Sequence, residues 1–147
     1  MSSIRVDFYL LASSEETSLV ACRLLEKAYL RGHRVFVYCN NQQEAEKIDE
    51  LLWTFKDNSF IPHNLQGEGP IPPPPIQIGY TNEPREFDDI LLNLNNEIPI
   101  FHSRFRRIIE IIGNDEKAKE LGRLRYREYR KKQFELQTHE IATTPAN

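Results

Sequence analysis

Two strand–helix units follow one another at the start of the chain, and this pattern restricts the fold more than any other feature. The four expected elements are a strand at Ile4–Leu11, a helix capped by Ser13 or Ser14, a strand at Arg34–Cys39, and a helix over Gln42–Leu52 capped by Asn40 or Asn41. Alternating elements with short links are typical of βαβ units. We therefore expect parallel strands joined by right-handed crossovers, with Gly32 ending the first helix.

The rest of the chain continues the same pattern. Further strands are predicted at Ile76–Tyr80, Asp89–Leu94 and Arg106–Ile112, and a long helix is predicted from Asp115 to about Lys132. No internal repeat or second domain is visible. The sequence predicts a single-domain α/β fold: a Rossmann-like open sheet, mostly parallel, with helices on both faces and no cofactor site. The domain spans residues 1–138, and residues 139–147 are expected to form a flexible C-terminal tail.

Composition excludes several classes of protein. The 147 residues are enough for one hydrophobic core, and they contain no apolar run long enough to cross a membrane and no secretion signal. Cys22 and Cys39 lie far apart without the spacing of a metal site, so we expect reduced thiols, no metal and a cytoplasmic location. The net charge of −3 argues against a general nucleic-acid binder.

Positive charge is concentrated in one segment. Residues 117–132 hold eight basic side chains and two acidic ones, a charge of +6, so the rest of the chain carries −9. On a helical wheel, Lys119, Arg123, Tyr126 and Arg130 fall within an arc of about 60°, while Leu121 and Leu124 are expected to face the sheet. Such a stripe suits an acidic peptide with an apolar end, or the phosphates of single-stranded DNA. The simpler alternative is a solvated helix face.

No catalytic arrangement is evident. The first strand–helix turn, residues 12–16, lacks the glycines that let a cofactor's phosphates approach the backbone, and it carries two carboxylates that repel them. His63 near Glu68 could act as a general base, but the spacing suggests neither a nucleophile nor a pocket. The alternative is that His63 hydrogen-bonds to the loop backbone and fixes a turn.

An aromatic segment lies between Asp49 and Pro70. It contains Trp53, Phe55 and Phe60 in a stretch that fits neither a helix nor a strand throughout. Large rings in a loop either fill the core of their own domain or form an apolar surface that another protein covers. The sequence leaves both alternatives open.

This segment resembles one family, the chi subunit of the bacterial DNA polymerase III holoenzyme. The family pattern matches at residues 48–53, and again at 59–70 with its Ser-Phe-x-Pro-His and Gly-Glu-Gly-Pro motifs. The basic, tyrosine-rich helix from Lys119 to Arg130 and the opening Asp-Phe-Tyr-Leu-Leu at residues 7–11 are similar to the family too. The proline run at residues 72–75 and the C-terminus are not.

The resemblance implies a non-catalytic adaptor in the clamp-loader assembly. It implies that the chain binds the psi subunit and the acidic C-terminal tail of single-stranded DNA-binding protein, and contacts DNA only indirectly. The residues that match the tail-binding helix are Lys119, Arg123, Tyr126, Arg127 and Arg130. We expect Trp53 and Phe60, helped by Pro62, to present an apolar surface to psi, because the loop is too hydrophobic to be left in water.

Two other functions remain as alternatives. A small nucleotide-binding enzyme would use the Rossmann-like fold, although the glycine loop is absent. A direct single-stranded DNA binder would use the basic helix, although the net charge is negative and no aromatic platform in a basic groove is evident from the sequence.

Overall fold

A computed structural model of the chain describes residues 4–12 and 16–141. The helices of this part are α1 (Thr17–Leu30), α2 (Gln42–Thr54) and α3 (Glu116–Lys131), with a short 3₁₀ turn, η1 (His102–Arg104). The strands are β1 (Arg5–Leu11), β2 (Val35–Tyr38), β3 (His63–Leu65), β4 (Ile76–Gly79), β5 (Ile90–Asn93), β6 (Arg107–Ile112) and β7 (Glu135–Ile141). None of the described helices is long and apolar enough to span a membrane.

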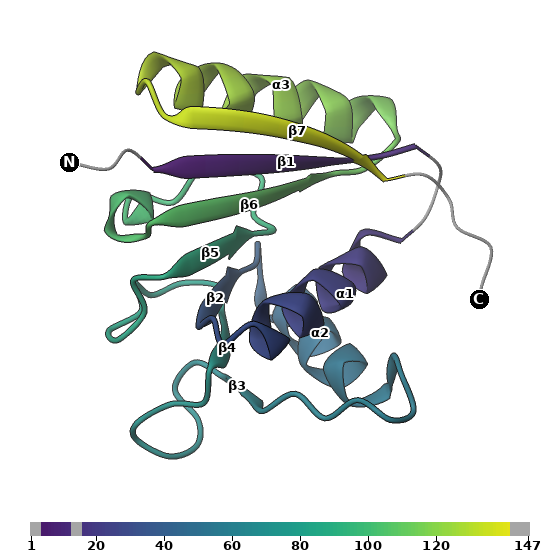
Figure 1. Ribbon diagram of the computed structural model, residues 1–147, viewed down its shortest axis with the longest axis vertical. Coiled ribbons are helices and arrows are strands. Elements are labelled where there is room, and N and C mark those ends of the chain that lie inside the picture. Colours follow the sequence, from purple (N-terminus) through teal and green to yellow (C-terminus); the bar gives the residue numbers. More distant parts are fainter. Residues whose placement is uncertain (1–3, 13–15, 142–147) are drawn as a thin grey trace.

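The described strands form one sheet in the order β3-β4-β2-β5-β6-β1-β7 (Figure 1). Every pairing in it is parallel. The predicted Rossmann-like open sheet is confirmed, and its strands are all parallel rather than mostly so. β3 and β7 are the two edges of the sheet, so segments next to them lie at opposite ends of the molecule.

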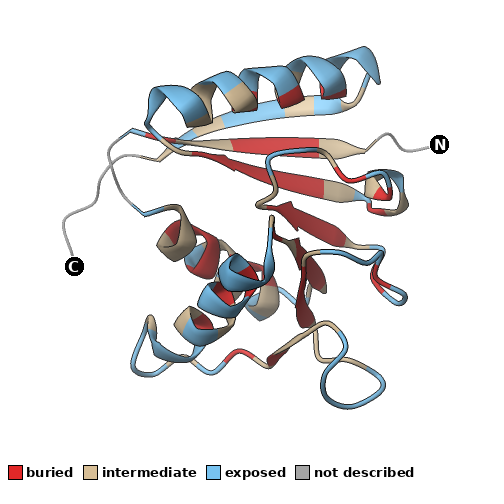
Figure 2. Ribbon diagram, turned by 180° about the vertical axis from the view of Figure 1, so that it is seen from behind, coloured by how far each residue is buried: buried red, intermediate tan, exposed pale blue. Residues whose placement is uncertain are grey.

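Helices cover both faces of the sheet, as predicted. α1 and α2 lie together on one face and α3 lies along β1 and β7 on the other (Figure 1). Alternation along β1 explains how one strand serves both layers: Leu11 packs with α1 and α2, whereas Val6 and Phe8 pack with Tyr129 of α3. Figure 2 shows the result, with buried strands between helices whose outer surfaces are exposed.

Local signals set the helix boundaries. The Asn41 side chain accepts the backbone N–H of Glu44 at 2.9 Å, and Asp115 caps α3 by accepting from Ala118 at 2.8 Å. Gly32 follows α1 with a φ of +84°, a conformation that favours glycine, as its place after the helix predicted. The predicted caps Ser13 and Ser14 lie outside the described residues.

Two expectations about chain segments are wrong, and one short strand was missed. The strand β7 runs to Ile141, so residues 139–141 belong to the sheet and not to a tail, while residues 142–147 lie outside the described part. Trp53 belongs to the last turn of α2 and not to the loop. The short strand β3 was not predicted, because it lies within the irregular aromatic segment and has only three residues.

Candidate binding surfaces

The face of α3 that meets the sheet is polar. Its buried residues are Gly122, Arg125 and Tyr129, whereas Leu124 is 50% exposed and Leu121 is only partly buried. The expectation that the two leucines face the sheet is therefore wrong. Burial of an arginine in place of leucines requires a buried partner on the sheet.

That partner is Glu110 of β6. Its carboxylate accepts hydrogen bonds from Arg125 Nε at 2.9 Å, Tyr129 Oη at 2.7 Å and Asn93 Nδ2 at 2.8 Å. Burial raises the pKa of Glu110, and the three donors act in the opposite direction. Burial and the neighbouring Glu110 raise the pKa of Tyr129 as well. Arg125 thus fixes α3 to the sheet, although it is one of the eight basic residues counted in this segment.

A groove opens between α3 and the β1–β7 edge of the sheet, and we call it the α3 groove. It has a volume of about 420 Å³. Its walls are formed by Phe8, Leu10, Leu11, Ile112, Gly113, Lys119, Gly122, Arg123, Tyr126 and Thr138. Its floor is apolar, and the ring of Tyr126 packs on Phe8 with a centroid distance of 5.2 Å. The close approach of α3 depends on Gly122, because a Cβ there would lie 2.6 Å from Ile112 Cδ1.

Three of the five predicted tail-binding residues line this groove. Lys119, Arg123 and Tyr126 lie on its α3 side, while Arg127 and Arg130 are exposed on the helix outside the lining. Within the described part of the chain, none of these four cations lies within 4.0 Å of a carboxylate. Their charge is therefore free to meet an external anion.

The other wall of the groove could not be found by sequence reasoning. Phe8, Leu10 and Thr138 come from β1 and β7, more than a hundred residues apart in the chain. The alternation in β1 places Phe8 and Leu10 on one face, but it does not tell which helix covers that face. β7 itself was not expected.

A second surface is aromatic and lies where α2 ends and β3 begins. Trp53 is 52% exposed and Phe60 is 66% exposed, and their ring centroids are 5.7 Å apart. Pro62 is partly buried beside them in the chain. The alternative that both rings fill the core of the domain is excluded. We call Trp53, Phe60 and Pro62 the aromatic surface.

The buried side chain of His63 packs against Trp53 of this surface. Its Nδ1 lies 2.6 Å from the carbonyl oxygen of Ile61, and its Nε2 lies 3.0 Å from that of Asp49. The side chain is fully buried and its ring lies 4.5 Å from that of Trp53. Backbone hydrogen bonding, the structural alternative for His63, is confirmed. Nε2 also lies 3.3 Å from the Asp49 carboxylate, so the ring is held by groups of its own domain.

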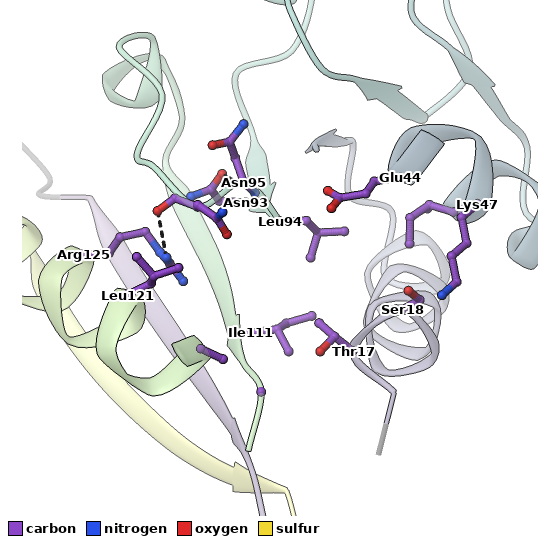
Figure 3. Close-up of a pocket in the computed structure, with 14 residues that line it drawn as sticks. Thr17, Ser18, Glu44, Lys47, Asn93, Leu94, Asn95, Ile111, Leu121 and Arg125 are labelled. Carbon is purple, nitrogen blue, oxygen red and sulfur yellow. Dashed lines mark hydrogen bonds between the residues drawn. The ribbon is translucent and has the colours of Figure 1, made fainter. Parts of the chain in front are cut away.

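A pocket of about 290 Å³ lies at the carboxyl ends of the strands, where α/β folds often bind cofactors (Figure 3). The cations around it are already paired: Lys47 with Glu16, and Arg125 with Glu110 and the Asn96 carbonyl oxygen. Glu44 adds a carboxylate to its lining. This arrangement does not favour a phosphate.

Reactive and metal-binding groups do not gather elsewhere in the described residues. Among them, no three His, Cys, Asp or Glu side chains are placed to hold a metal ion. Burial raises the pKa of both Cys22 and Cys39 to about 12, so neither thiol is activated.

Comparison with known proteins assigns the family. A family model described as DNA polymerase III chi subunit, HolC, matches residues 3–137. A DNA polymerase III subunit chi of Pseudomonas aeruginosa is 34% identical over 139 residues, which cover 93% of this chain and 96% of the relative. The corresponding protein of Haemophilus influenzae is 34% identical over 91% of this chain and 95% of the relative. That of Escherichia coli is 32% identical over 81% and 82%. The chain belongs to the DNA polymerase III chi subunit family.

Proposed function

We propose that this accessory subunit is a non-catalytic adaptor of the replication clamp loader in the bacterial cytoplasm. It binds the acidic C-terminal tail of single-stranded DNA-binding protein in the α3 groove and the psi subunit on the aromatic surface. The observation that carries the proposal is the α3 groove, in which an apolar floor is bordered by Lys119 and Arg123, neither of which has a carboxylate partner in the described part of the chain.

The groove suits a peptide that ends in an apolar residue and is preceded by acidic ones. The apolar side chain enters beside Tyr126 and Phe8, and the guanidinium of Arg123 receives a carboxylate through two parallel hydrogen bonds. Arg127 and Arg130, exposed farther along α3, attract the acidic residues that precede the end of the tail.

The aromatic surface suits a folded protein partner. Exposed Trp and Phe rings in contact are typical of the centre of protein interfaces, and water is a poor environment for them. His63 holds Trp53 from the buried side, so the surface is ordered before the partner arrives. Psi is the partner that membership of the chi family suggests.

The positions of the two surfaces support simultaneous binding. The aromatic surface adjoins β3 and the α3 groove adjoins β7, at opposite edges of the sheet. A subunit held on the clamp loader through psi then meets many copies of the tail on coated DNA, and a weak tail contact becomes effective through local concentration.

Titration of labelled tail peptide against variants tests the proposal. Arg123→Ala should weaken binding about ten- to a hundredfold, the effect of losing a charge-assisted contact. Arg123→Lys should rescue only part of the loss, because an ammonium lacks the planar fork. Tyr126→Ala should weaken binding of the peptide although it leaves the charge of the protein unchanged. Arg85→Ala, which removes an exposed cation outside the groove, is the control.

A site that binds the phosphates of DNA would behave differently from one that binds the tail peptide. Each cation of the stripe would then contribute alike, Tyr126 would matter little, and bare single-stranded DNA would displace the peptide from the groove. The proposal is contradicted if DNA displaces the peptide and Tyr126→Ala binds the peptide as tightly as the wild type does.

A further inference from the structure

A basic hollow of about 310 Å³ lies on the face of the sheet opposite to α3. α1 packs on β2 and β6, and the sheet continues beyond it with β1 and β7. The hollow lies between the C-terminal end of α1 and these strands. It is separated from the α3 groove by the sheet itself, because Phe8 and Leu10 of β1 point to one face and Tyr9 to the other. Neither proposed binding surface includes it.

The lining of this hollow is basic. Its lining contains four cations, Arg5, Lys27, Arg31 and Arg107, together with two histidines and no carboxylate. Four positive charges in one hollow are unusual on a chain of net charge −3. The carboxyl end of α1 contributes a partial negative charge of about 0.5, which the four cations far exceed.

A buried carboxylate beneath the hollow holds part of its lining in place. Asp7 is fully buried and accepts hydrogen bonds from Arg5 Nη2 at 3.1 Å, Arg107 Nε at 2.7 Å and His139 Nε2 at 2.8 Å. Burial raises the pKa of Asp7, but hydrogen bonds from His139, Arg107 and Arg5 outweigh that effect, and the pKa is lowered. One negative charge thus orders three cationic or titratable groups.

Donors remain free above this carboxylate. Arg107 uses Nε for Asp7, and within the described residues its two Nη nitrogens have no acceptor. Lys27 in the last turn of α1 and Arg31 at its C-cap have no carboxylate of the described residues within 4.0 Å. Two further carboxylates lie near the lining: Asp89 pairs with His33 at 3.0 Å, and the charge of Glu135 acts on Arg5. Among the described residues, Lys27, Arg31 and the two Nη nitrogens of Arg107 therefore remain available to an anion.

An aromatic pair adjoins these donors on the sheet. The ring of Tyr9 stacks on that of His139 with a centroid distance of 4.7 Å and an interplanar angle of 20°. Both side chains are partly exposed and both line the hollow. Rings on a sheet surface among cations are the elements with which proteins bind single strands of nucleic acid, where phosphates meet the cations and bases stack on the rings.

We infer that this hollow is a second binding site, which takes the phosphate backbone of single-stranded DNA with a base against Tyr9 and His139. Membership of a DNA polymerase subunit family favours DNA over other phosphate carriers. The site goes beyond the proposed adaptor function, since it adds a direct contact with the template on the face away from the tail. The aromatic platform that the sequence did not reveal is formed by residues 130 positions apart.

Fluorescence anisotropy with a labelled oligothymidylate at low salt tests this inference. Each phosphate neutralised on a single strand adds about −0.7 to the slope of log affinity against log salt. Because Asp7 compensates one of the four cations, the slope should be about −2. The variant Lys27→Glu/Arg31→Glu should lose at least about tenfold in affinity and bring the slope to about −0.7. The control Arg85→Glu/Lys117→Glu makes the same change in net charge with exposed residues outside the hollow, and it should stay within about twofold.

Two further arms separate this site from the proposed function. The Lys27→Glu/Arg31→Glu variant should bind the tail peptide normally, and Arg123→Ala should bind the oligonucleotide normally. An abasic strand of the same length should bind at least about fivefold more weakly, because it cannot stack. The inference is overturned if no oligonucleotide binds, if the control loses as much as the variant, or if a polyglutamate peptide occupies the hollow in preference to DNA. None of these results affects the tail-binding proposal.

Discussion

The aromatic surface allows one prediction to be worked through in numbers. In Trp53→Ala the α2 helix keeps a good helix former, and the change removes a ring that is already half exposed in the folded protein. The main loss should therefore fall on binding of psi and not on the fold.

The expected magnitude follows from exposed area. A large aromatic side chain offers about 250 Å², so the exposed half of Trp53 is about 130 Å², and covering it contributes about 3 kcal/mol. Part of this is offset by ordering at the interface, which leaves at least about 2 kcal/mol, or about thirtyfold in affinity. The free energy of unfolding should fall by less than about 2 kcal/mol, because the ring packs mainly on Phe60 and His63.

Isothermal titration with purified psi, together with urea unfolding of the variant alone, measures both quantities. Ile100→Ala is the matched control, since Ile100 is 94% exposed and apolar but lies between β5 and η1, away from the aromatic surface. A Trp53→Ala variant that binds psi normally refutes the reasoning. So does one that loses its fold, because the ring would then belong to the core.

Three further predictions concern the fold around the sites. Glu110→Gln should lower the free energy of unfolding by about 3 kcal/mol in urea denaturation, because it leaves the charge of Arg125 buried without a counter-charge. The pKa of Asp7 is lowered in the folded state, so its contribution to stability is complete above the ordinary value of 3.8 and is lost as the pH falls through the folded value. Unfolding of the wild type should therefore depend more steeply on pH below about 4 than unfolding of Asp7→Asn. Gly122→Ala should push α3 away from Ile112, lower the melting temperature by several degrees and weaken the tail peptide, whereas the same substitution at an exposed, unpacked glycine would not affect the peptide.

Much of the sheet could be predicted because its strands carry strong local signals. The apolar runs of β1, β2 and β6, and the caps Asn41 and Asp115, are evident in the sequence and lie where expected. β7 has no such run. Its side chains are largely exposed at a sheet edge, and it is a strand because β1 pairs with it, which is a contact across the whole chain.

The candidate sites were predictable in part for the same reason. The stripe of Lys119, Arg123 and Tyr126 is local to one helix and needs only the helical period. The inward face of α3 was mispredicted, because leucine is the usual residue there and the carboxylate of Glu110 that admits Arg125 comes from β6. The basic hollow could not be predicted at all, because its residues come from β1, α1, β6 and β7, which are far apart in the sequence.

Chemical-shift mapping of the isotope-labelled protein, with tail peptide added first and psi second, tests the adaptor account most directly. The account predicts that the peptide shifts resonances around Lys119, Arg123 and Tyr126. Psi should then shift those around Trp53 and Phe60 without displacing the peptide, because the two surfaces lie at opposite edges of the sheet. Peptide-induced shifts away from both α3 and the α3 groove, or loss of the peptide when psi binds, would contradict the account.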